Sequence, residues 1–337
     1  MKKKILIINS GGTIGMTKSE FGYRPDGVYF SRLLKNMDAL KADIMPDWEM
    51  AETETLLDSS NMTVEDWNSI GKIIADAYSS YDGFVILHGT DTMAYTASAL
   101  SFMLEGLSKP VILTGSQIPL CEVRSDGRDN IITSLLIAAS GKINEVCVYF
   151  GNRLLRGNRS IKYSADGLVA FVSPNCSPLA EAGISISYND AVIRECKNAG
   201  EFSFVPLKNI PIGVIKVFPG IQFELFESIM TEQLRGIVIE TFGAGNIPQQ
   251  GNSLLPIIEK AFLNGTVLVV CSQCPQGTVS LGTYETSSAL KDAGAVSGKD
   301  ITTEAAVAKL YYLFSKGYDK GKIKELMGSN LCGEMSE

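Results

Sequence analysis

Two short polar segments carry side chains that could perform covalent chemistry. In the first, SGGTIG at residues 10–15, a threonine follows two consecutive glycines. Glycines let the backbone turn tightly and expose amide N–H groups, so Thr13 could be a nucleophile beside a site that stabilises an oxyanion. A plain strand-to-helix turn would use the same residues, and composition alone favours that simpler interpretation.

The second segment, HGTDTM at residues 88–93, is denser in functional groups. Asp91 stands at the expected start of a helix, beside two threonines and His88, the only histidine of the chain. Its carboxylate could cap the helix or bind a substrate ammonium, and the residues leave both open. His88 could act as a general base, but we favour a packed, hydrogen-bonded histidine. Lys162 would matter only beside Thr90 and Asp91, where a cation lowers the cost of deprotonating a hydroxyl.

Other chemistries fit the sequence poorly. The glycines at 10–15 match neither the dinucleotide-binding pattern nor the P-loop pattern. With one histidine, the chain cannot assemble a His-rich metal site. Cys271 and Cys274 have C-x-x-C spacing, but zinc would require a second pair. A redox pair stays open, and we favour buried core thiols.

Charge and cysteine usage limit the partners and the compartment. Lys plus Arg is 30 and Asp plus Glu is 37, which gives a net charge of −7 and disfavours binding to nucleic acid. No apolar run approaches the ~18 residues of a membrane helix, and residues 5–8 are too short for a secretion signal. Seven cysteines, an odd number, fit reduced thiols. We therefore expect a cytoplasmic protein with no nucleic-acid or membrane partner.

Apolar strands and amphipathic helices alternate along most of the chain. The strands are continuous Val/Ile/Leu-rich runs, as expected when both faces of a parallel sheet are covered. They are predicted at Lys4–Asn9, Phe84–Leu87, Val111–Thr114, Val146–Phe150, Ile212–Val217, Ile237–Thr241 and Val267–Cys271. Helices are predicted over 63–78, Met93–Leu104, Asn130–Ala139, Leu254–Phe262 and Thr303–Phe314, the first opening with a capping-box-like pair, Thr63 and Asp66. The alternation predicts an α/β fold.

The stretch from about residue 173 to residue 211 interrupts this rhythm with four prolines and only weak strands, such as 191–193. We therefore predict an N-terminal catalytic domain over 1–190, a linker over 191–211 and a smaller C-terminal α/β domain over 212–337. The larger domain should hold a mainly parallel, flavodoxin-like sheet. Ligands bind at the carboxyl ends of such strands, so we expect the polar loops to meet on one rim.

Around these loops the sequence resembles the bacterial-type L-asparaginase/glutaminase family, in particular its cytoplasmic (type I) branch. The resemblance spans nearly the whole chain and follows the order of the family's segments. The matching segments are IINSGGTIGM, VILHGTDTMAYTASAL, TGSQIP, RSDGRDN, RGNRSIKYSADG and GAGNIP.

The resemblance implies an amidohydrolase with two catalytic threonines. Thr13 would attack the side-chain amide carbon of L-asparagine, forming a covalent aspartyl-enzyme and releasing ammonia. Tyr23, in a segment implied to act as a lid, would hydrogen-bond Thr13 and help remove its proton. Thr90, with Lys162 and Asp91, would position the water that hydrolyses the intermediate.

The resemblance also implies how substrate is held. Asp91 would bind the substrate ammonium, aided by Asp58 and Ser59. Further substrate-binding positions are Gly12, Gly89, Ser116 and Asn246. No metal and no organic cofactor would be required.

Family members are usually homotetramers built from close dimers, so the resemblance implies self-association as a homodimer or homotetramer, and Asn246 matches the position expected to reach into a neighbour's site. At two positions associated with an effector pocket, this chain has Ile161 and Glu240, where a threonine and an arginine are expected. Because glutamate would repel the effector's carboxylate, we expect weak or no activation by asparagine.

Three alternatives stay open. The chain could be a glutaminase-asparaginase, since one methylene gives only ~1–3 kcal/mol of discrimination. It could be the ammonia-releasing subunit of a tRNA-dependent amidotransferase, although that subunit usually carries an extra N-terminal domain and the first strand here begins at Lys4. It could also be a non-catalytic amino-acid-binding module that keeps Asp91 and Ser59.

Overall fold

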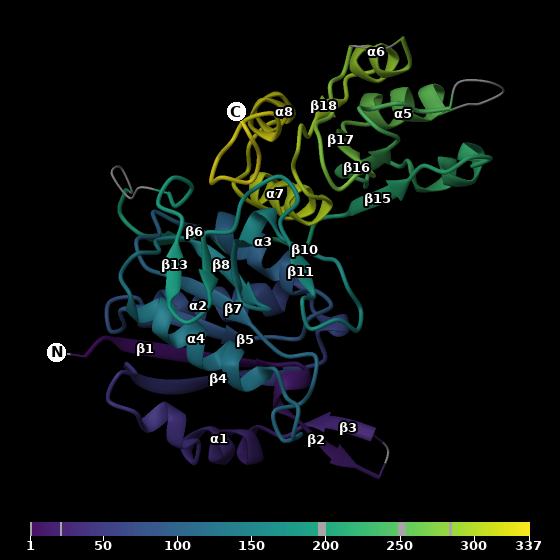
Figure 1. Cartoon of the computed structure of the whole chain (residues 1–337). Coiled ribbons are helices and arrows are strands. Elements are labelled where there is room, and N and C mark those ends of the chain that lie inside the picture. Colours follow the sequence, from purple (N-terminus) through teal and green to yellow (C-terminus); the bar gives the residue numbers. More distant parts are fainter. Residues whose placement is uncertain (1, 21, 195–199, 249–253, 283–284) are drawn as a thin grey trace. The chain divides into compact units, whose positions relative to one another are not determined.

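The computed structural model describes residues 2–20, 22–194, 200–248, 254–282 and 285–337. The chain divides into two compact units, 1–206 and 207–337, each with its own sheet (Figure 1).

The first unit is built on an eight-stranded sheet. Five neighbouring strands, β8, β7, β5, β1 and β4, are parallel, with β4 at one edge of the sheet, whereas β9, β12 and β13 extend the other edge in antiparallel fashion. In spatial order the strands are β13 (Ile186–Tyr188), β12 (Ala180–Ala182), β9 (Arg153–Arg156), β8 (Val146–Phe150), β7 (Val111–Thr114), β5 (Gly83–Leu87), β1 (Lys4–Gly11) and β4 (Asp47–Leu57). The predicted mainly parallel sheet is therefore confirmed.

Helices bury the apolar runs of this sheet. Phe30 and Leu34 of α1 (Gly27–Lys35) and Ile131 of α4 (Gly127–Ala139) share one buried cluster with alternate residues of β1 and β5. The helices α2 (Val64–Ala77) and α3 (Met93–Met103) pack against each other and against sheet strands. Strands β1, β5, β7 and β8 are buried on both faces, as their continuous hydrophobic runs predicted.

Short elements at the carboxyl ends of these strands carry the polar segments. They are η1 (Thr13–Gly15), the hairpin β2 (Met16–Ser19) and β3 (Gly22–Pro25), η3 (Ser59–Asn61) and the pair β10 (Ile161–Lys162) and β11 (Phe171–Val172). By contrast, η4 (Gly157–Arg159) follows the antiparallel strand β9 and lies at the amino end of β8. The remaining short elements of this unit are η2 (Asp38–Lys41), β6 (Leu104–Glu105) and β14 (Ser203–Phe204).

The second unit contains a four-stranded, fully parallel sheet. Its order is β15 (Ile212–Lys216), β16 (Gly236–Thr241), β17 (Val267–Ser272) and β18 (Val296–Ser297). Its helices are η5 (Phe223–Ile229), α5 (Leu254–Leu263), α6 (Glu285–Asp292), α7 (Thr303–Ser315) and α8 (Lys320–Met327). Lys309 of α7 forms an ion pair with Glu334 at 2.6 Å, and both side chains are fully buried. This pair fixes the C-terminal segment to the core of the unit.

All seven predicted strands and five predicted helices are confirmed, with ends shifted by at most three residues. The predicted capping box is present, since the Asp66 carboxylate accepts a hydrogen bond from the Thr63 amide at 2.8 Å. The strand predicted at 191–193 is wrong: Asn189 accepts bonds from the amides of Val192 and Ile193, which closes a turn. In the part of the chain that the structure describes, no helix is both long and apolar enough to cross a membrane.

Candidate active site

The loops that follow β1 and β5 lie against each other. These strands are adjacent and parallel, and their carboxyl ends coincide. Gly12 has φ +84°, and a side-chain Cβ at this position would overlap the backbone nitrogen and α-carbon of Gly89. Only glycine meets both conditions without strain. Thr13 and Thr90 directly follow these two glycines, so the fold brings the two loops that carry the candidate hydroxyls into contact.

A third segment, η3, closes onto the same loops. Ser59 is buried, and a Cβ on Gly89 would overlap its hydroxyl. The Ser59 carbonyl accepts a hydrogen bond from Thr92 Oγ1 at 2.7 Å. The Asp58 carboxylate caps η3 by accepting a bond from the Ser60 amide at 3.0 Å. Ser59 is therefore held beside the second polar loop, and Asp58 shapes the turn that holds it.

Lys162 joins Thr90 and Asp91 into one cluster. Its Nζ donates to Thr90 Oγ1 at 2.9 Å and forms an ion pair with Asp91 Oδ1 at 2.5 Å. Thr90 is buried, the Lys162 side chain is 20% exposed and the Asp91 side chain is 59% exposed. The N-cap of α3 is Thr92, so Asp91 serves as an ion-pair partner and not as the helix cap. The ammonium favours negative charge on the hydroxyl that it contacts.

Gln117, which the sequence did not single out, completes this cluster. Its Oε1 accepts a hydrogen bond from Thr90 Oγ1 at 3.2 Å. Its Nε2 donates to the carbonyls of Ala165 and Gly167, each at 3.1 Å. The only available signal was its place in TGSQIP, directly after β7. Since its contacts are up to 50 residues away in sequence, no local pattern could reveal them.

The backbone around Gln117 is firmly held. Its amide donates to both carboxylate oxygens of Asp126, at 3.0 and 3.1 Å, and Asn130 Nδ2 donates to the Gly115 carbonyl at 2.9 Å. Ser116 is 1% exposed, and its hydroxyl has no partner among the described residues. A buried hydroxyl without a partner is costly, so Ser116 has bonding capacity for a water or a bound molecule.

Backbone amides near the two threonines differ in availability. The Gly12 N–H donates to the Leu57 carbonyl at 2.9 Å, so this amide is already used within the protein. The amides of Thr13 and Thr90 have no acceptor within the described ranges. Gly12 therefore contributes its conformation, and the next amide along the chain is the better candidate for binding a developing oxyanion.

His88 is a structural residue, as predicted. It is fully buried, and its Nδ1 lies 2.7 Å from its neighbour's carbonyl, that of Gly89. The other nitrogen, Nε2, is 2.9 Å from Thr96 Oγ1, which also accepts a bond from Trp67 Nε1 at 3.0 Å. Because a carbonyl only accepts, Nδ1 must donate to it. Burial lowers the pKa of His88 to about 4.

Tyr23 does not hydrogen-bond Thr13 in this structure, so the bond that the resemblance implied stays a prediction. Its hydroxyl donates instead to Glu122 Oε1 at 2.7 Å, and this bond raises the pKa of Tyr23. The reason lies in the hairpin register, which pairs Tyr23 with Lys18, five residues beyond Thr13. Among the described residues, the Thr13 hydroxyl has no hydrogen-bond partner.

Two residues named from the sequence lie in the second unit. The backbones of Asn246 and Phe242 exchange two hydrogen bonds, at 2.9 and 3.0 Å, which close the loop after β16. Glu240, on β16, accepts a bond from Thr303 Oγ1 at 2.6 Å. Glu240 is therefore already engaged within its own unit, whereas the reach of Asn246 into a neighbouring copy stays a prediction.

Only one cysteine of the C-x-x-C pair is buried, whereas both were predicted to be. Cys271 is buried, and burial raises its thiol pKa, but Cys274 is exposed because it lies beyond the end of β17. Six cysteines are described, each as a free thiol, and Cys196 lies outside the described residues. Within the described ranges, no group of His, Cys, Asp and Glu could hold a metal ion.

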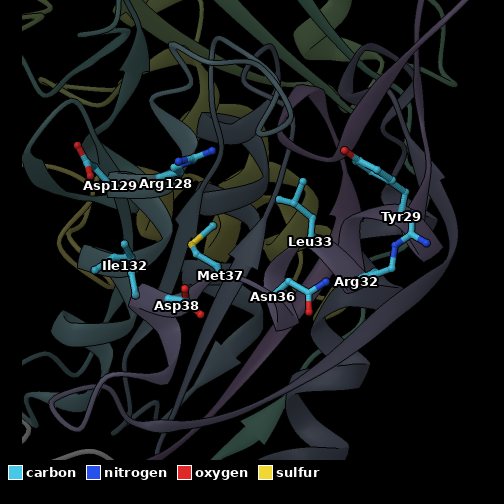
Figure 2. Close-up of a pocket in the computed structure, with 10 residues that line it drawn as sticks. Tyr29, Arg32, Leu33, Asn36, Met37, Asp38, Arg128, Asp129 and Ile132 are labelled. Atoms are coloured by element: carbon cyan, nitrogen blue, oxygen red, sulfur yellow. The ribbon is translucent and has the colours of Figure 1, made fainter.

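A cavity of about 590 Å³ lies between α1 and α4 (Figure 2). Leu33, Met37 and Ile132 line it with apolar side chains, and Arg32 and Arg128 add charged ones. None of the predicted site residues lines it. Because the hydroxyls and the lysine gather at the rim of the sheet, we place the candidate site there.

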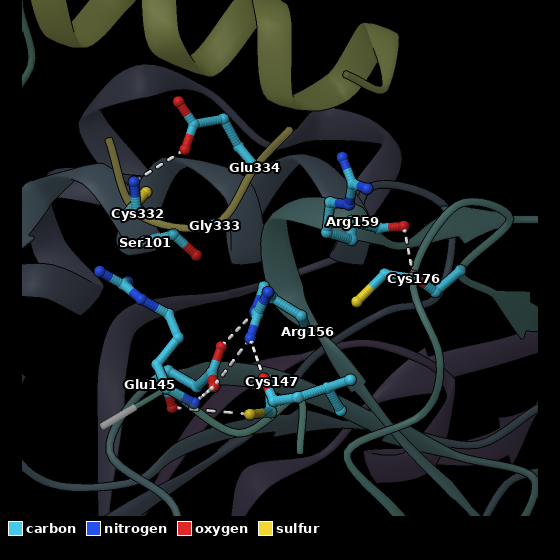
Figure 3. A network of polar contacts seen from close by, with 12 residues as sticks. Ser101, Glu145, Cys147, Arg156, Arg159, Cys176, Cys332, Gly333 and Glu334 are labelled. Carbon is cyan, nitrogen blue, oxygen red and sulfur yellow. Dashed lines mark hydrogen bonds and ion pairs between the residues drawn. The ribbon is translucent and has the colours of Figure 1, made fainter. Parts of the chain in front are cut away.

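A second polar network in the first unit has a different character (Figure 3). Arg156 Nε bonds Glu145 Oε2 at 2.6 Å, and the two side chains are 11% and 5% exposed. Arg156 also donates to the Val192 carbonyl, and Glu145 accepts a bond from the Arg194 amide. This network joins the ends of β8 and β9 to the segment that follows β13 and offers little access to a ligand.

Known proteins are similar to this chain over nearly its whole length. Residues 4–194 match the family model "Asparaginase, N-terminal", and residues 211–327 match the "Glutaminase/Asparaginase C-terminal domain". L-asparaginase 1 of Escherichia coli is 46% identical, over 99% of this chain and 98% of that protein. The crystal structure of L-asparaginase I from Vibrio cholerae has a TM-score of 0.92 at 47% identity, covering both chains completely. The thermostable L-asparaginase from Thermococcus kodakarensis has a TM-score of 0.87 at 32% identity and covers 99% of each chain.

Proposed function

Since the chain belongs to the asparaginase family, we propose that it hydrolyses L-asparagine to L-aspartate and ammonia. The observation that carries this proposal is the cluster of Thr90, Lys162 and Asp91, whose loop packs directly on the loop of Thr13. A hydroxyl is a weak nucleophile at neutral pH and needs an adjacent proton acceptor and preorganised donors. The rim of the large sheet offers hydroxyls, an ammonium, a carboxylate and free amides in one place.

The first half-reaction would be acylation of Thr13. Its Oγ attacks the side-chain amide carbon, the C–N bond breaks, and the hydroxyl proton passes to the departing nitrogen, which leaves as ammonia. The free amides of Thr13 and Thr90 are suited to the oxyanion that develops on the substrate oxygen. For Tyr23 to assist the proton transfer, it must exchange its bond to Glu122 for one to Thr13. We therefore propose that the β2–β3 hairpin moves when substrate binds.

The second half-reaction would be hydrolysis of the aspartyl-Thr13 ester. A water oxygen attacks the acyl carbon, the ester C–O bond breaks, and Thr13 recovers its proton. Thr90, in contact with Lys162, is placed to hold this water. Both steps balance without a metal or an organic cofactor.

Substrate recognition in this proposal rests on charge. Asp91 keeps an exposed side of its carboxylate for the substrate ammonium, aided by Ser59 and by the turn that Asp58 caps. Since a desolvated ion pair is stronger than an exposed one, a covering surface would improve binding. We propose that a second copy of the chain supplies this surface through Asn246, in a homodimer or homotetramer.

The decisive experiment measures ammonia release from L-asparagine and L-glutamine side by side, with neither tRNA nor a partner protein present. We expect activity on asparagine, with a loss of at least about 10³-fold in Thr13→Ala. Thr17→Ala, in strand β2 of the same segment, is the matched control and should retain activity. Full activity of Thr13→Ala would refute the mechanism. Activity only with tRNA and a partner would favour the amidotransferase alternative, and binding without turnover would favour an amino-acid-binding module.

The proposed setting is the cytoplasm. The support is the set of six described free thiols, one of them exposed, since an oxidising compartment favours disulfides.

A further inference from the structure

The amide of Gln117 can adopt only one orientation in its surroundings. The two carbonyls of Ala165 and Gly167 face one end of the amide, and carbonyl oxygens accept hydrogen bonds but cannot donate them. The NH₂ group must therefore point to them, which leaves Oε1 facing Thr90 Oγ1 at 3.2 Å. An amide oxygen is only an acceptor, so the Thr90 hydroxyl has to donate to it.

This fixed orientation determines where the one proton of Thr90 lies. A threonine hydroxyl has one proton to donate and two lone pairs. The proton points to Gln117, and the Lys162 ammonium donates to one lone pair at 2.9 Å. The remaining lone pair is the bonding capacity that the Thr90 hydroxyl keeps for a molecule in the site.

We propose that Gln117 is a positioning residue that makes Thr90 a hydrogen-bond acceptor toward the hydrolytic water. This inference rests on the proposed asparaginase function and assigns Gln117 to its second half-reaction. A water that donates one hydrogen to Thr90 Oγ presents an oxygen lone pair to the acyl carbon. Without Gln117, the Thr90 proton is free to turn into the site, where it would donate to the water oxygen and occupy the lone pair needed for attack.

The proton balance of the step does not require Thr90 to take a proton. The water oxygen forms a bond to the acyl carbon, and the bond from that carbon to Thr13 Oγ breaks. One water proton passes to Thr13 Oγ, which leaves as the neutral hydroxyl, and the second is released with the new carboxyl group. Thr90 directs the water, and Gln117 directs Thr90.

Gln117 has a second function that the test must separate from the first. Through Ala165 and Gly167 it also anchors the turn that follows Lys162, so its removal could disturb the structure more generally. Gln273 offers a matched control, because its Nε2 likewise donates to two backbone carbonyls, those of Val217 and Glu240, at 2.5 and 2.8 Å. It contacts no proposed catalytic side chain.

The experiment compares the full-length protein with Gln117→Met, which keeps the side-chain length and removes both polar atoms. We expect slower hydrolysis of the intermediate, so that kcat and KM fall together by about 10-fold while kcat/KM changes less than about 2-fold. Rapid mixing should then show a burst of ammonia close to one per active site, and mass spectrometry should find acylated Thr13. Gln273→Met should show neither change.

A double-mutant cycle tests whether Gln117 acts through Thr90. In a Thr90→Val background, adding Gln117→Met should change kcat by less than about 2-fold, because the group that it orients is already absent. Equal effects of Gln117→Met with and without Thr90 would overturn the inference, as would a fall in kcat/KM with no burst. If Thr13 is not acylated in any variant and Thr13→Ala is active, the proposed function itself fails. If Thr90→Val accumulates acylated Thr13 and Gln117→Met does not, only the role of Gln117 fails.

Discussion

The first unit holds two pairs of opposite charge that differ in what they leave open. Arg156 and Glu145 are nearly inaccessible, and backbone groups on both sides use their further hydrogen-bonding capacity (Figure 3). Lys162 and Asp91 sit at the rim of the sheet, with the carboxylate 59% exposed and the ammonium shared with a hydroxyl. A buried, saturated pair is costly to break and offers nothing to a ligand, whereas an unsaturated pair can bind and polarise one. Exposure and residual bonding capacity therefore separate the two functions better than the ion pairs themselves do.

The strongest way to test the comparison is to break the saturated pair. Arg156→Met leaves Glu145 buried without its cation, which typically costs about 3–5 kcal/mol. We expect the free energy of unfolding to fall by that amount, measured by denaturant titration. Activity per folded molecule should hardly change.

Arg153→Met is the control for this change. Arg153 pairs with Glu181 at 3.5 Å across the antiparallel edge, with both side chains largely exposed. Because exposed pairs contribute only about 0–1 kcal/mol, this variant should unfold almost like the parent. Equal losses of unfolding free energy in the two variants would mean that burial and saturation do not decide how much an ion pair contributes to stability.

The converse test removes the cation of the unsaturated pair, Lys162 and Asp91. Lys162→Met deprives Thr90 of its charged donor, and we expect kcat to fall by about 10²–10³-fold, the usual effect of losing one electrostatic contact to reacting groups. The melting temperature should move little, because the pair is partly solvated. Steady-state kinetics and calorimetry on the same preparation measure both. A large loss of stability with unchanged kcat would reverse the assignment of the two pairs.

Some elements of the first unit could be predicted from the sequence, and others could not. Strands β1, β5, β7 and β8 were predictable because each is buried on both faces and therefore largely apolar. The edge strand β4, Asp47–Leu57, was not, since it is charged and half-exposed along most of its length. The loops at the rim were predictable from strand order, because carboxyl ends of neighbouring parallel strands meet. Which loop residues bond each other was not, as Gln117 and Tyr23 illustrate with partners 27 to 99 residues away.

The buried, neutral side chain of His88 makes a contribution to stability that depends on pH. The pKa of His88 is about 4 in the folded protein, because burial disfavours its charged form, against 6.5 when unfolded. The folded state thus binds fewer protons than the unfolded state between these values. The stability that the neutral ring provides is complete above pH 6.5 and is lost as the pH falls toward 4. The linkage amounts to about 3 kcal/mol.

His88→Gln isolates this contribution. The difference in unfolding free energy between the parent and this variant should shrink by about 3 kcal/mol from pH 7 to pH 4, since glutamine does not titrate. Denaturant titrations at several pH values measure it. A difference that is constant with pH would mean that His88 is not held in its neutral form.

The smallest expected effect concerns the β2–β3 hairpin. There the exposed hydrogen bond from Tyr23 to Glu122 replaces the bond to Thr13 that the proposed mechanism needs. Tyr23 donates to Glu122, and this bond raises the pKa of the phenol. Glu122→Gln removes the charged acceptor, so the pKa of Tyr23 should move down toward its ordinary value. Tyrosine ring carbons labelled with ¹³C, with Tyr23→Phe to assign the signal, allow the titration to be followed by NMR.

Because the bond between Tyr23 and Glu122 is exposed, Glu122→Gln should change kcat by less than a few-fold, and the direction of the change is informative. A rise means that the bond to Glu122 competes with the bond to Thr13, whereas a fall means that Glu122 supports Tyr23 during the reaction and that the hairpin need not move.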